Sequence, residues 1–283
     1  GADRDDGCGG RRPVTTQRTM LGLREALEPL RAGSRIGLVP TMGALPLGHA
    51  ALIRRARAEC DVVVASIFVN PAQFGVLEDL DRYPRDEDGD AELAAGWGVD
   101  HLFVPSVAEM YPQGFQTWVD VEAIADDLEG AGRPGHFRGV ATVCLKLFNI
   151  VAPDVAYFGR KDAQQAVVVE RMVLDLDLPL EIRVVETVRD PDGVAISSRN
   201  AYLSPEERAA AGAIPRALEA GAEAHRRGED GAAAARAVLS GEALLDPEYV
   251  QVARLDGRLY LLAAVRVGRT RLIDNVALEG NPE

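Results

Sequence analysis

Residues 39–49 read Val-Pro-Thr-Met-Gly-Ala-Leu-Pro-Leu-Gly-His, and this stretch decides the fold of the chain. An apolar run, residues 36–39, leads into it, and residues 51–57, in which apolar and basic residues alternate, follow it. This order predicts a strand, a tight turn that contains glycine, and then a helix. Gly43 and Gly48 allow a positive φ or a close approach of the backbone to a ligand.

The first turn of the predicted helix is suited to bind phosphate. Its backbone N–H groups have no partner within the helix, and the positive end of the helix dipole lies there. His49 stands at this position. The alternative is an ordinary connection between a strand and a helix, with His49 as a capping residue. Because such turns occur often by chance, this stretch alone leaves both interpretations open.

The other apolar runs and helical spacings give the order of the elements. Strands are expected at residues 36–41, 61–69, 101–105, 118–121, 155–158 and 181–188, and helices at 19–32, 49–60, 86–97, 142–151 and 162–174. This alternation predicts an α/β fold with a doubly wound parallel sheet, whose ligand lies beyond the carboxyl ends of the strands. After residue 189 we expect helices at 201–227 and 231–239, then strands at 249–253, 258–265 and 270–275, as in a smaller α+β domain.

Two polar stretches follow predicted strands, Phe158-Gly-Arg-Lys-Asp at 158–162 and Ile-Ser-Ser-Arg-Asn at 196–200. Together with residues 39–49, and in this order, they resemble the pantothenate synthetase (pantoate–β-alanine ligase) family. The further matching stretches are residues 68–74, 81–85, 133–137, 159–165 and 270–275. The resemblance covers nearly the whole chain after about residue 18, and its ordered set of motifs is far more specific than any one of them.

The resemblance implies an ATP-dependent ligase. Pantoate would attack the α-phosphate of ATP to give pantoyl-adenylate and pyrophosphate, and β-alanine would then displace AMP. Mg²⁺ would bridge the phosphates and keep most of its waters, so no metal site with direct protein ligands is expected. The family also implies a homodimer and a Rossmann-like sheet of the nucleotidyltransferase type. Residues 1–17 are polar, rich in charge and contain glycine, so we expect a disordered tail there. The resemblance implies a domain for nucleotide and pantoate at 18–188 and a lid at 189–283.

The resemblance also assigns residues to the nucleotide. The residues expected to act in catalysis are His49, Lys161, Ser197, Ser198 and Arg199, and those expected to complete the ATP site are Met42, Gly48, Gly159, Asp162, Val188 and Ile196. Asp162 has the chemistry to bind a ribose hydroxyl, but it is also a good N-cap for the next helix. A Ser-Ser-Arg-Asn sequence often forms only a hydrogen-bonded turn.

The acid and the amine are assigned to a second set, which is Pro40, Gln73, Gln165, Arg133 and His136. Uncharged amides such as those of Gln73 and Gln165 suit a carboxylate that must remain nucleophilic, since a tight arginine pair would hold its electrons back. Arg133 and His136 are expected to orient substrates, and a solvated basic loop is an equal alternative for them.

The chain departs from the family at one central position. The family has His-x-Gly-His where this chain has Pro46-Leu-Gly-His49. Proline carries neither charge nor a donor, so the loss of a charge-stabilising histidine is expected to lower the rate by about 10². Three hypotheses remain: a ligase with reduced rate, a ligase of the same mechanism with another acid or amine, and a nucleotide-binding protein without turnover. A cytidylyltransferase, which shares only the first motif, is a distant fourth.

Composition excludes several classes of protein. A net charge of −13 argues against a nucleic-acid surface, and no apolar run approaches the length of a membrane span. The three cysteines have no paired spacing, which favours a reducing cytoplasm. Among 31 basic residues only Lys146 and Lys161 are lysines, and Lys161 stands in the turn where a compact charge would meet phosphate.

Overall fold

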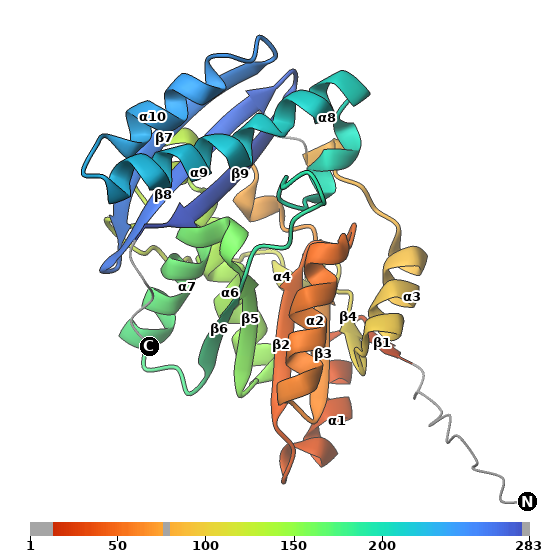
Figure 1. Ribbon diagram of the computed structural model, residues 1–283. Coiled ribbons are helices and arrows are strands. Elements are labelled where there is room, and N and C mark those ends of the chain that lie inside the picture. The colour runs from red at the N-terminus through yellow and green to blue at the C-terminus, as the bar shows by residue number, and fades with distance from the viewer. Residues whose placement is uncertain (1–13, 76–79, 279–283) are drawn as a thin grey trace, which may run out of the picture.

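The computed structural model describes residues 14–75 and 80–278, and Figure 1 shows them as a large and a small unit. The large unit is built on six strands in the order β1-β4-β3-β2-β5-β6, and every recorded pairing is parallel. The strands are β1 (Thr15–Gln17), β2 (Ile36–Thr41), β3 (Val62–Ile67), β4 (His101–Phe103), β5 (Val155–Gly159) and β6 (Glu181–Val185). This arrangement confirms the predicted doubly wound α/β sheet.

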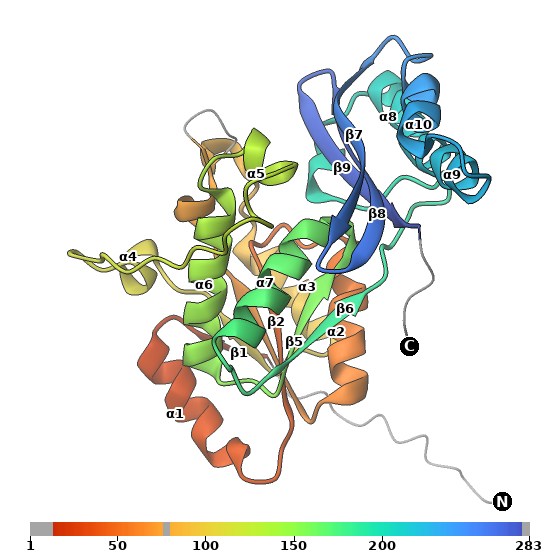
Figure 2. The same ribbon diagram turned by 90° about the vertical axis from the view of Figure 1, so that its left-hand side faces the viewer.

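Helices cover both faces of the sheet, as Figure 2 shows. Those on one face are α1 (Met20–Arg31), α6 (His136–Val151) and α7 (Ala163–Asp175), and those on the other are α2 (Leu47–Glu59) and α3 (Glu87–Trp97). Successive residues of a strand point to opposite faces of the sheet. Leu38 therefore packs against α1, α6 and α7, and Val39 packs against α2 and α3. Because β2 and β3 are buried throughout except at Pro40, they read in the sequence as continuous apolar runs.

The small unit is α+β, as predicted. Its helices are α8 (Pro205–Ala211), α9 (Ala213–Arg226) and α10 (Gly231–Leu239), and its antiparallel strands are β7 (Leu245–Leu255), β8 (Arg258–Val267) and β9 (Thr270–Ala277). One face of β8 packs on these helices through residues such as Leu261. The other face places Tyr260 and Leu262 against Leu128 and Ala163 of the large unit. The small unit thus lies on the large one (Figure 1), and the contact between them is apolar.

Two expectations at the level of elements are wrong. Residues 15–17 were expected in the tail, but they form β1 and pair with β4. They are polar, so no apolar pattern marks this edge strand. Residues 118–121 were expected to form a strand and form none. Instead Val119 N donates to Thr142 Oγ1 at 3.0 Å, and the Trp118 ring stacks on Tyr111. The rest of the expected tail, residues 1–13, lies outside the described residues.

Two helix limits also differ from the prediction. α6 begins at His136 rather than at Thr142, because Phe137 and Val140 already face the core. The helix expected at 201–227 is divided at Gly212. Its first part starts at Pro205 after a capping box formed by Ser204 and Glu207, as the Ser-Pro-Glu-Glu sequence at 204–207 indicates. Within the described residues no helix is long and apolar enough to cross a membrane.

Candidate active site

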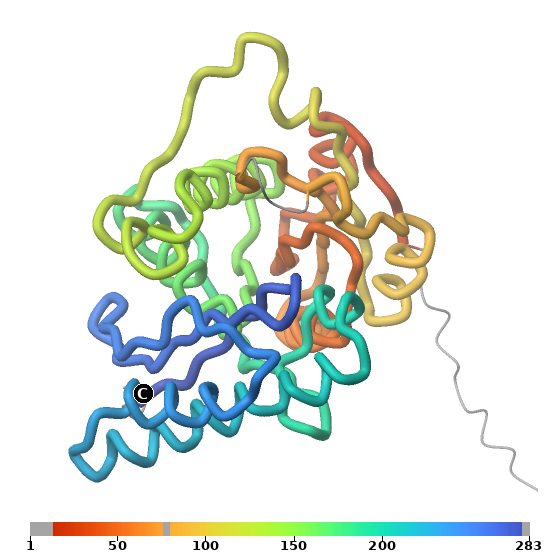
Figure 3. Tube along the Cα trace, turned by 90° about the horizontal axis from the view of Figure 1, so that it is seen from above, coloured from red at the N-terminus to blue at the C-terminus, as the bar shows by residue number. Residues whose placement is uncertain are grey.

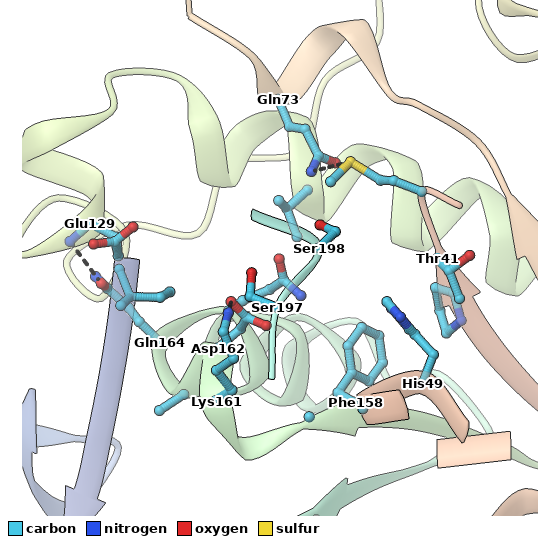
Figure 4. Close-up of a pocket in the computed structure, with 18 of the residues that line it drawn as sticks. Thr41, His49, Gln73, Glu129, Phe158, Lys161, Asp162, Gln164, Ser197 and Ser198 are labelled. Atoms are coloured by element: carbon cyan, nitrogen blue, oxygen red, sulfur yellow. Dashed lines mark hydrogen bonds and ion pairs between the residues drawn. The ribbon is translucent and has the colours of Figure 1, made fainter. Parts of the chain in front are cut away.

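A cleft of about 240 Å³ lies between the carboxyl ends of the parallel strands and the small unit, and Figure 4 shows part of its lining. It is formed by the segments that follow β2, β3, β5 and β6, together with β9. All residues that the sequence assigned to a site line this one cleft: Pro40, Met42, Gly48, His49, Gln73, Arg133, His136, Gly159, Lys161, Asp162, Gln165, Val188, Ile196, Ser197, Ser198 and Arg199. Segments far apart in the chain thus meet around one space.

The turn after β2 is braced by Asp90, a buried carboxylate on α3. Asp90 accepts hydrogen bonds from Ala44 N at 2.7 Å and Leu45 N at 2.8 Å. Burial raises the pKa of Asp90, and these two amides oppose the rise. Gly43 has φ +81°, and a Cβ there would lie 2.8 Å from Asp90 Oδ2, so the close packing requires glycine. Sequence analysis missed Asp90 because it is one of several acidic residues in its helix.

His49 lies in the first turn of α2 with its side chain toward the cleft (Figure 4). Its Nδ1 is buried and has no hydrogen-bond partner among the residues that the structure describes. Loss of water lowers the pKa of His49 to about 4; Asp162 opposes this shift and Lys161 adds to it. At neutral pH the imidazole is therefore uncharged. This ring nitrogen is therefore available to a ligand atom in the cleft.

Lys161 and Asp162 lie in a 3₁₀ turn, Arg160–Asp162, that directly follows β5. Lys161 Nζ is 3.3 Å from Asp162 Oδ1, and the lysine side chain is 19% exposed. Burial works against ionisation of Asp162, but Lys161, Arg199 and His49 outweigh it, so the pKa of Asp162 is lowered. No side-chain cap hydrogen bond from Asp162 to α7 is formed. Asp162 therefore occupies the N-cap position of α7, as the alternative expected, but its carboxylate is not used to cap the helix.

Residues 196–200 form a turn, and the first four of them line the cleft. Ser197 Oγ accepts from Arg199 N at 3.2 Å, and Asn200 Nδ2 donates to Ala195 O at 3.1 Å. Ile196 N donates to Val188 O at 2.9 Å, which holds these two apolar residues side by side in the lining. The hydrogen-bonded turn expected as an alternative is thus present, and it orients the loop toward the cleft.

Gln73 offers its amide to the cleft, and Asn70 orients that amide. Asn70 is 1% exposed, and its Nδ2 donates to Gln73 Oε1 at 3.0 Å and to Gly139 O at 3.1 Å. Gln73 Nε2 lies 3.1 Å from Met42 Sδ, a weak acceptor that a carboxylate would readily replace. Asn70 was not singled out from the sequence, where it stands only within the matching stretch 68–74, because its burial and its contact with Gln73 appear only in the fold.

Arg133 and His136 also act on Gln73. His136 Nδ1 is 2.9 Å from Gln73 O, and Arg133 Nη1 is 2.9 Å from His136 Nε2. A carbonyl only accepts, so Nδ1 carries the proton and Nε2 accepts from Arg133, which makes the imidazole neutral. This chain of hydrogen bonds fixes the backbone of Gln73. The geometry therefore favours an orienting role for both residues over a solvated basic loop.

Neighbouring glutamines on α7 have different surroundings. Gln164 is 2% exposed; its Nε2 donates to Ile124 O at 2.7 Å, and its Oε1 accepts from Glu129 N at 3.0 Å. It anchors the short helix α5 (Glu129–Gly132). Gln165 lines the cleft, and within residues 14–75 and 80–278 no hydrogen bond of its amide is recorded. Gln165 is therefore the glutamine with capacity left for a ligand.

Glu129 connects the two units beside the cleft. Its carboxylate makes two hydrogen bonds to Arg271 of β9, at 2.8 and 2.6 Å, and accepts one from Tyr249 of β7 at 2.8 Å. Burial opposes ionisation, but Arg271 outweighs it and lowers the pKa of Glu129. A buried ion pair of this kind fixes relative orientation more than it stabilises the fold. Sequence analysis did not single out either partner.

Each of the four carboxylates in the cleft lining already has a cationic partner. The pairs are Glu129–Arg271, Asp162–Lys161, Glu186–Arg160 and Asp274–Arg189. In the part of the chain that the structure describes, no three His, Cys, Asp or Glu side chains are gathered as metal ligands.

Comparisons with known proteins agree on one family. A family model described as Pantoate-beta-alanine ligase matches residues 15–277. Pantothenate synthetase of Roseiflexus castenholzii is 57% identical over 257 residues, covering 86% of this chain and 92% of the relative. That of Moorella thermoacetica is 55% identical over 277 residues, covering 93% of this chain and 98% of the relative.

Two solved structures support the same match. Pantothenate synthetase from Thermus thermophilus superposes with a TM-score of 0.90 at 45% identity, covering 94% of this chain and 100% of the other. Pantoate-beta-alanine ligase from Francisella tularensis, complexed with beta-gamma ATP and beta-alanine, superposes with a TM-score of 0.81 at 35% identity, covering 95% and 100%.

Proposed function

We propose how the cleft works from one premise: this chain belongs to the pantoate–β-alanine ligase family. It is an ATP-dependent ligase that condenses pantoate with β-alanine, and the related Francisella structure holds a nucleotide and β-alanine. The observation that carries the proposal is that side chains suited to bind phosphate and side chains that offer amides meet in one cleft. Lys161, Ser198 and Arg199 provide the first kind, and Gln73 and Gln165 the second.

The reaction needs a leaving group on the pantoate carboxylate. A carboxylate oxygen attacks the α-phosphorus of ATP, a new O–P bond forms, and the bond to the β-phosphate breaks to release pyrophosphate. The amine of β-alanine then attacks the acyl carbon, the C–O bond to AMP breaks, and the amine loses a proton. Little covalent chemistry is asked of the protein, so positioning and charge stabilisation supply the catalysis.

We assign the nucleotide to the side of the cleft formed by the turn after β5. Lys161 is a compact charge on a flexible stem, which suits the oxygens of a phosphate, and Arg199 and Ser198 complete the set. Neutral His49 donates to a phosphate oxygen from the first turn of α2. Asp162, which stays ionised, accepts from a ribose hydroxyl. Met42, Val188 and Ile196 supply the apolar surface for adenine.

Mg²⁺ enters with ATP in this proposal. The ion prefers phosphate oxygens and retained water to a cage of protein ligands. The pairing of every cleft carboxylate with a cation fits that preference. When bound to the phosphates, Mg²⁺ would supply positive charge that favours the release of pyrophosphate.

The amides are assigned to pantoate. Gln73→Ala and Gln165→Ala should each raise the KM for pantoate about 10-fold or more, because each removes a hydrogen bond to a charged group. The KM for ATP should change less than about 3-fold. Steady-state kinetics with each substrate varied in turn measure both values. Gln251→Ala, at an exposed position on β7, is the control and should change neither. Equal increases for both substrates would show that the glutamines only support the cleft.

The whole reaction is tested with purified protein, ATP, Mg²⁺, pantoate and β-alanine. Pantothenate, AMP and pyrophosphate should appear in equal amounts by mass spectrometry. Formation of ADP and phosphate instead would contradict an adenylating ligase. A ligase for another amine and a nucleotide-binding protein without turnover are not favoured, since relatives at 57% and 55% identity are pantothenate synthetases.

We further propose a homodimer in the cytoplasm, with residues 189–278 acting as a lid. The segment 111–127 arches away from the body (Figure 3) and carries Trp118, which is 40% exposed. Such an aromatic surface is suited to an interface. The buried free thiols of Cys60 and Cys144 fit a reducing compartment. Light scattering should give about twice the chain mass of 30.3 kDa, and the monomer mass would contradict the dimer.

A further inference from the structure

The two segments assigned to phosphate belong to different parts of the chain and must keep a fixed spacing. The Lys161 turn follows β5 of the large unit, whereas residues 196–199 come after the connection to the small unit. Strand β9 reaches both: Asp274 and Asn275 lie in the cleft lining and are 3% and 4% exposed. Neither belongs to the set assigned above to substrates.

Asn275 is bonded directly to the Lys161 turn. Its Nδ2 donates to Arg160 O and to Lys161 O, both at 2.9 Å. The amide thus uses both of its N–H groups on two successive carbonyls, one of them the carbonyl of Lys161 itself. The opposite amide orientation would place Oδ1 against two carbonyl oxygens, so this assignment of nitrogen and oxygen is fixed by its partners.

The two polar atoms of the Asn275 amide have different surroundings. Its Oδ1 is buried and finds no partner among the described residues. A buried acceptor without a hydrogen bond is unfavourable, so the side chain is placed by its two donors and not by full satisfaction of its polar atoms. The Nδ2 group therefore fixes the turn, while Oδ1 is left without a hydrogen bond.

Asp274 orients both Asn275 and the second phosphate segment. Its carboxylate binds Arg189 at 2.6 and 2.9 Å, and its Oδ1 accepts from Asn275 N at 2.8 Å. Arg189 also donates to Gly193 O at 3.0 Å and forms a β-bridge with Ala195, next to the loop at 196–199. Two adjacent residues of β9 are therefore connected to both segments.

We propose that Asn275, oriented by Asp274, is a positioning residue that holds the Lys161 ammonium in register with the 196–199 loop for adenylation. The proposal rests on the proposed function, in which both segments bind the phosphates of ATP. Asn275 touches no reacting atom in this scheme. It acts because a displacement of about 1 Å in a catalytic group can lower a rate about 10²-fold.

The alternative is that Asn275 merely joins the two units. Two other contacts already do so: the Glu129–Arg271 ion pair and the apolar contact that includes Leu262. If Asn275 only joined the units, its substitution would let the units separate or would destabilise the fold, but it would have no specific effect on the environment of Lys161. A measurement of the local environment of Lys161 in the folded protein distinguishes the two roles.

The composition of the chain makes that measurement simple. Because Lys146 and Lys161 are its only lysines, reductive methylation with ¹³C-formaldehyde gives two lysine signals in an NMR spectrum, besides the N-terminal amine. Methylation keeps the charge of the ammonium. Lys161→Arg removes one signal and thereby assigns both. Lys146, in the C-terminal half of α6, serves as the internal reference.

Asn275→Asp keeps the shape of the side chain but replaces the donor by an acceptor that faces two carbonyls. We expect the Lys161 signal of the ligand-free variant to move while the Lys146 signal stays. Single-turnover formation of pantoyl-adenylate should fall about 10²-fold, and the KM for pantoate should change less than about 3-fold. Asn275→Ala, which adds no charge, carries the same expectation and replaces the aspartate variant if that does not fold.

Asn149→Asp is the matched control, because it makes the same change at an exposed position of α6. It should leave both signals and the adenylation rate unchanged. An unmoved Lys161 signal with an unchanged rate in the Asn275 variants would overturn the positioning role. If ATP fails to shift the Lys161 signal of the parent protein, the assignment of Lys161 to phosphate is wrong instead. The effect of the Asn275 variants on the signal of the ligand-free protein would still show whether Asn275 positions Lys161.

Discussion

Lys161→Ala is expected to lower the rate of pantoyl-adenylate formation about 10³-fold. The reason is that the ammonium stabilises charge on the phosphates as the α-phosphate is attacked, in a cleft where few waters can replace it. Folding should be little affected, since the side chain of Asp162, the partner of Lys161, is 42% exposed when the cleft holds no substrate and can then be hydrated. The measurement is single-turnover formation of the adenylate, followed by quenching and mass spectrometry.

Two further variants define what the lysine contributes. Lys161→Arg should recover only a small part of the rate, because a planar guanidinium does not reproduce the geometry of an ammonium. Lys146→Ala is the control: Lys146 lies 5.1 Å from the Phe115 ring and is not among the residues that line the cleft. Near-parental adenylation by Lys161→Ala would remove this residue from the mechanism.

Pro46→His is expected to speed adenylation about 10-fold. Pro46 lines the cleft at the N-cap of α2, where the family resemblance has a histidine, and makes no side-chain cap hydrogen bond. Its φ of −78° and ψ of 170° are ordinary for any residue, so histidine fits the backbone without strain. A histidine there would interact with charge that develops on the phosphates, so the gain should appear in turnover more than in ATP affinity.

The neighbouring position offers a second step. Leu47 is 60% exposed in the first turn of α2, where a carboxylate is favourable to the helix dipole. We expect a larger gain for Pro46→His combined with Leu47→Glu than for Pro46→His alone, with Leu47→Glu alone as the control. Single-turnover adenylation compares the four proteins. A parent that is already fast and is slowed by histidine would show that Pro46 is an adaptation and that another group does this work.

The sequence predicted the sheet well because its central strands are buried on both faces. β2 and β3 therefore appear as apolar runs, and the segments after parallel strands were expected to meet at one edge. Edge and loop segments were less predictable. β1 is polar and is defined only by its pairing with β4, and residues 118–121 have strand-like composition but no neighbouring strand among the described residues.

The residues of the site were also predictable only in part. Residues that carry the chemistry, such as Lys161 and Gln73, could be named from motifs. Of the residues that position them, Arg133 and His136 could also be named. Asn275 and Glu129 could not, because the contacts of these two cross long distances in the chain. Asn275 bonds to residues 114 and 115 positions away, and Glu129 pairs with Arg271 across 142 positions. No local pattern in a single sequence records such contacts.

The central claim, activation of pantoate as an adenylate in this cleft, is tested most directly by isotope transfer. Pantoate labelled with ¹⁸O in its carboxylate is turned over with ATP, Mg²⁺ and β-alanine, and the products are analysed by mass spectrometry. Because the bond between the carboxylate oxygen and the α-phosphorus survives when the amine displaces AMP, we predict one ¹⁸O in AMP and none in pyrophosphate. Label in inorganic phosphate together with ADP, or AMP without label, would contradict the account.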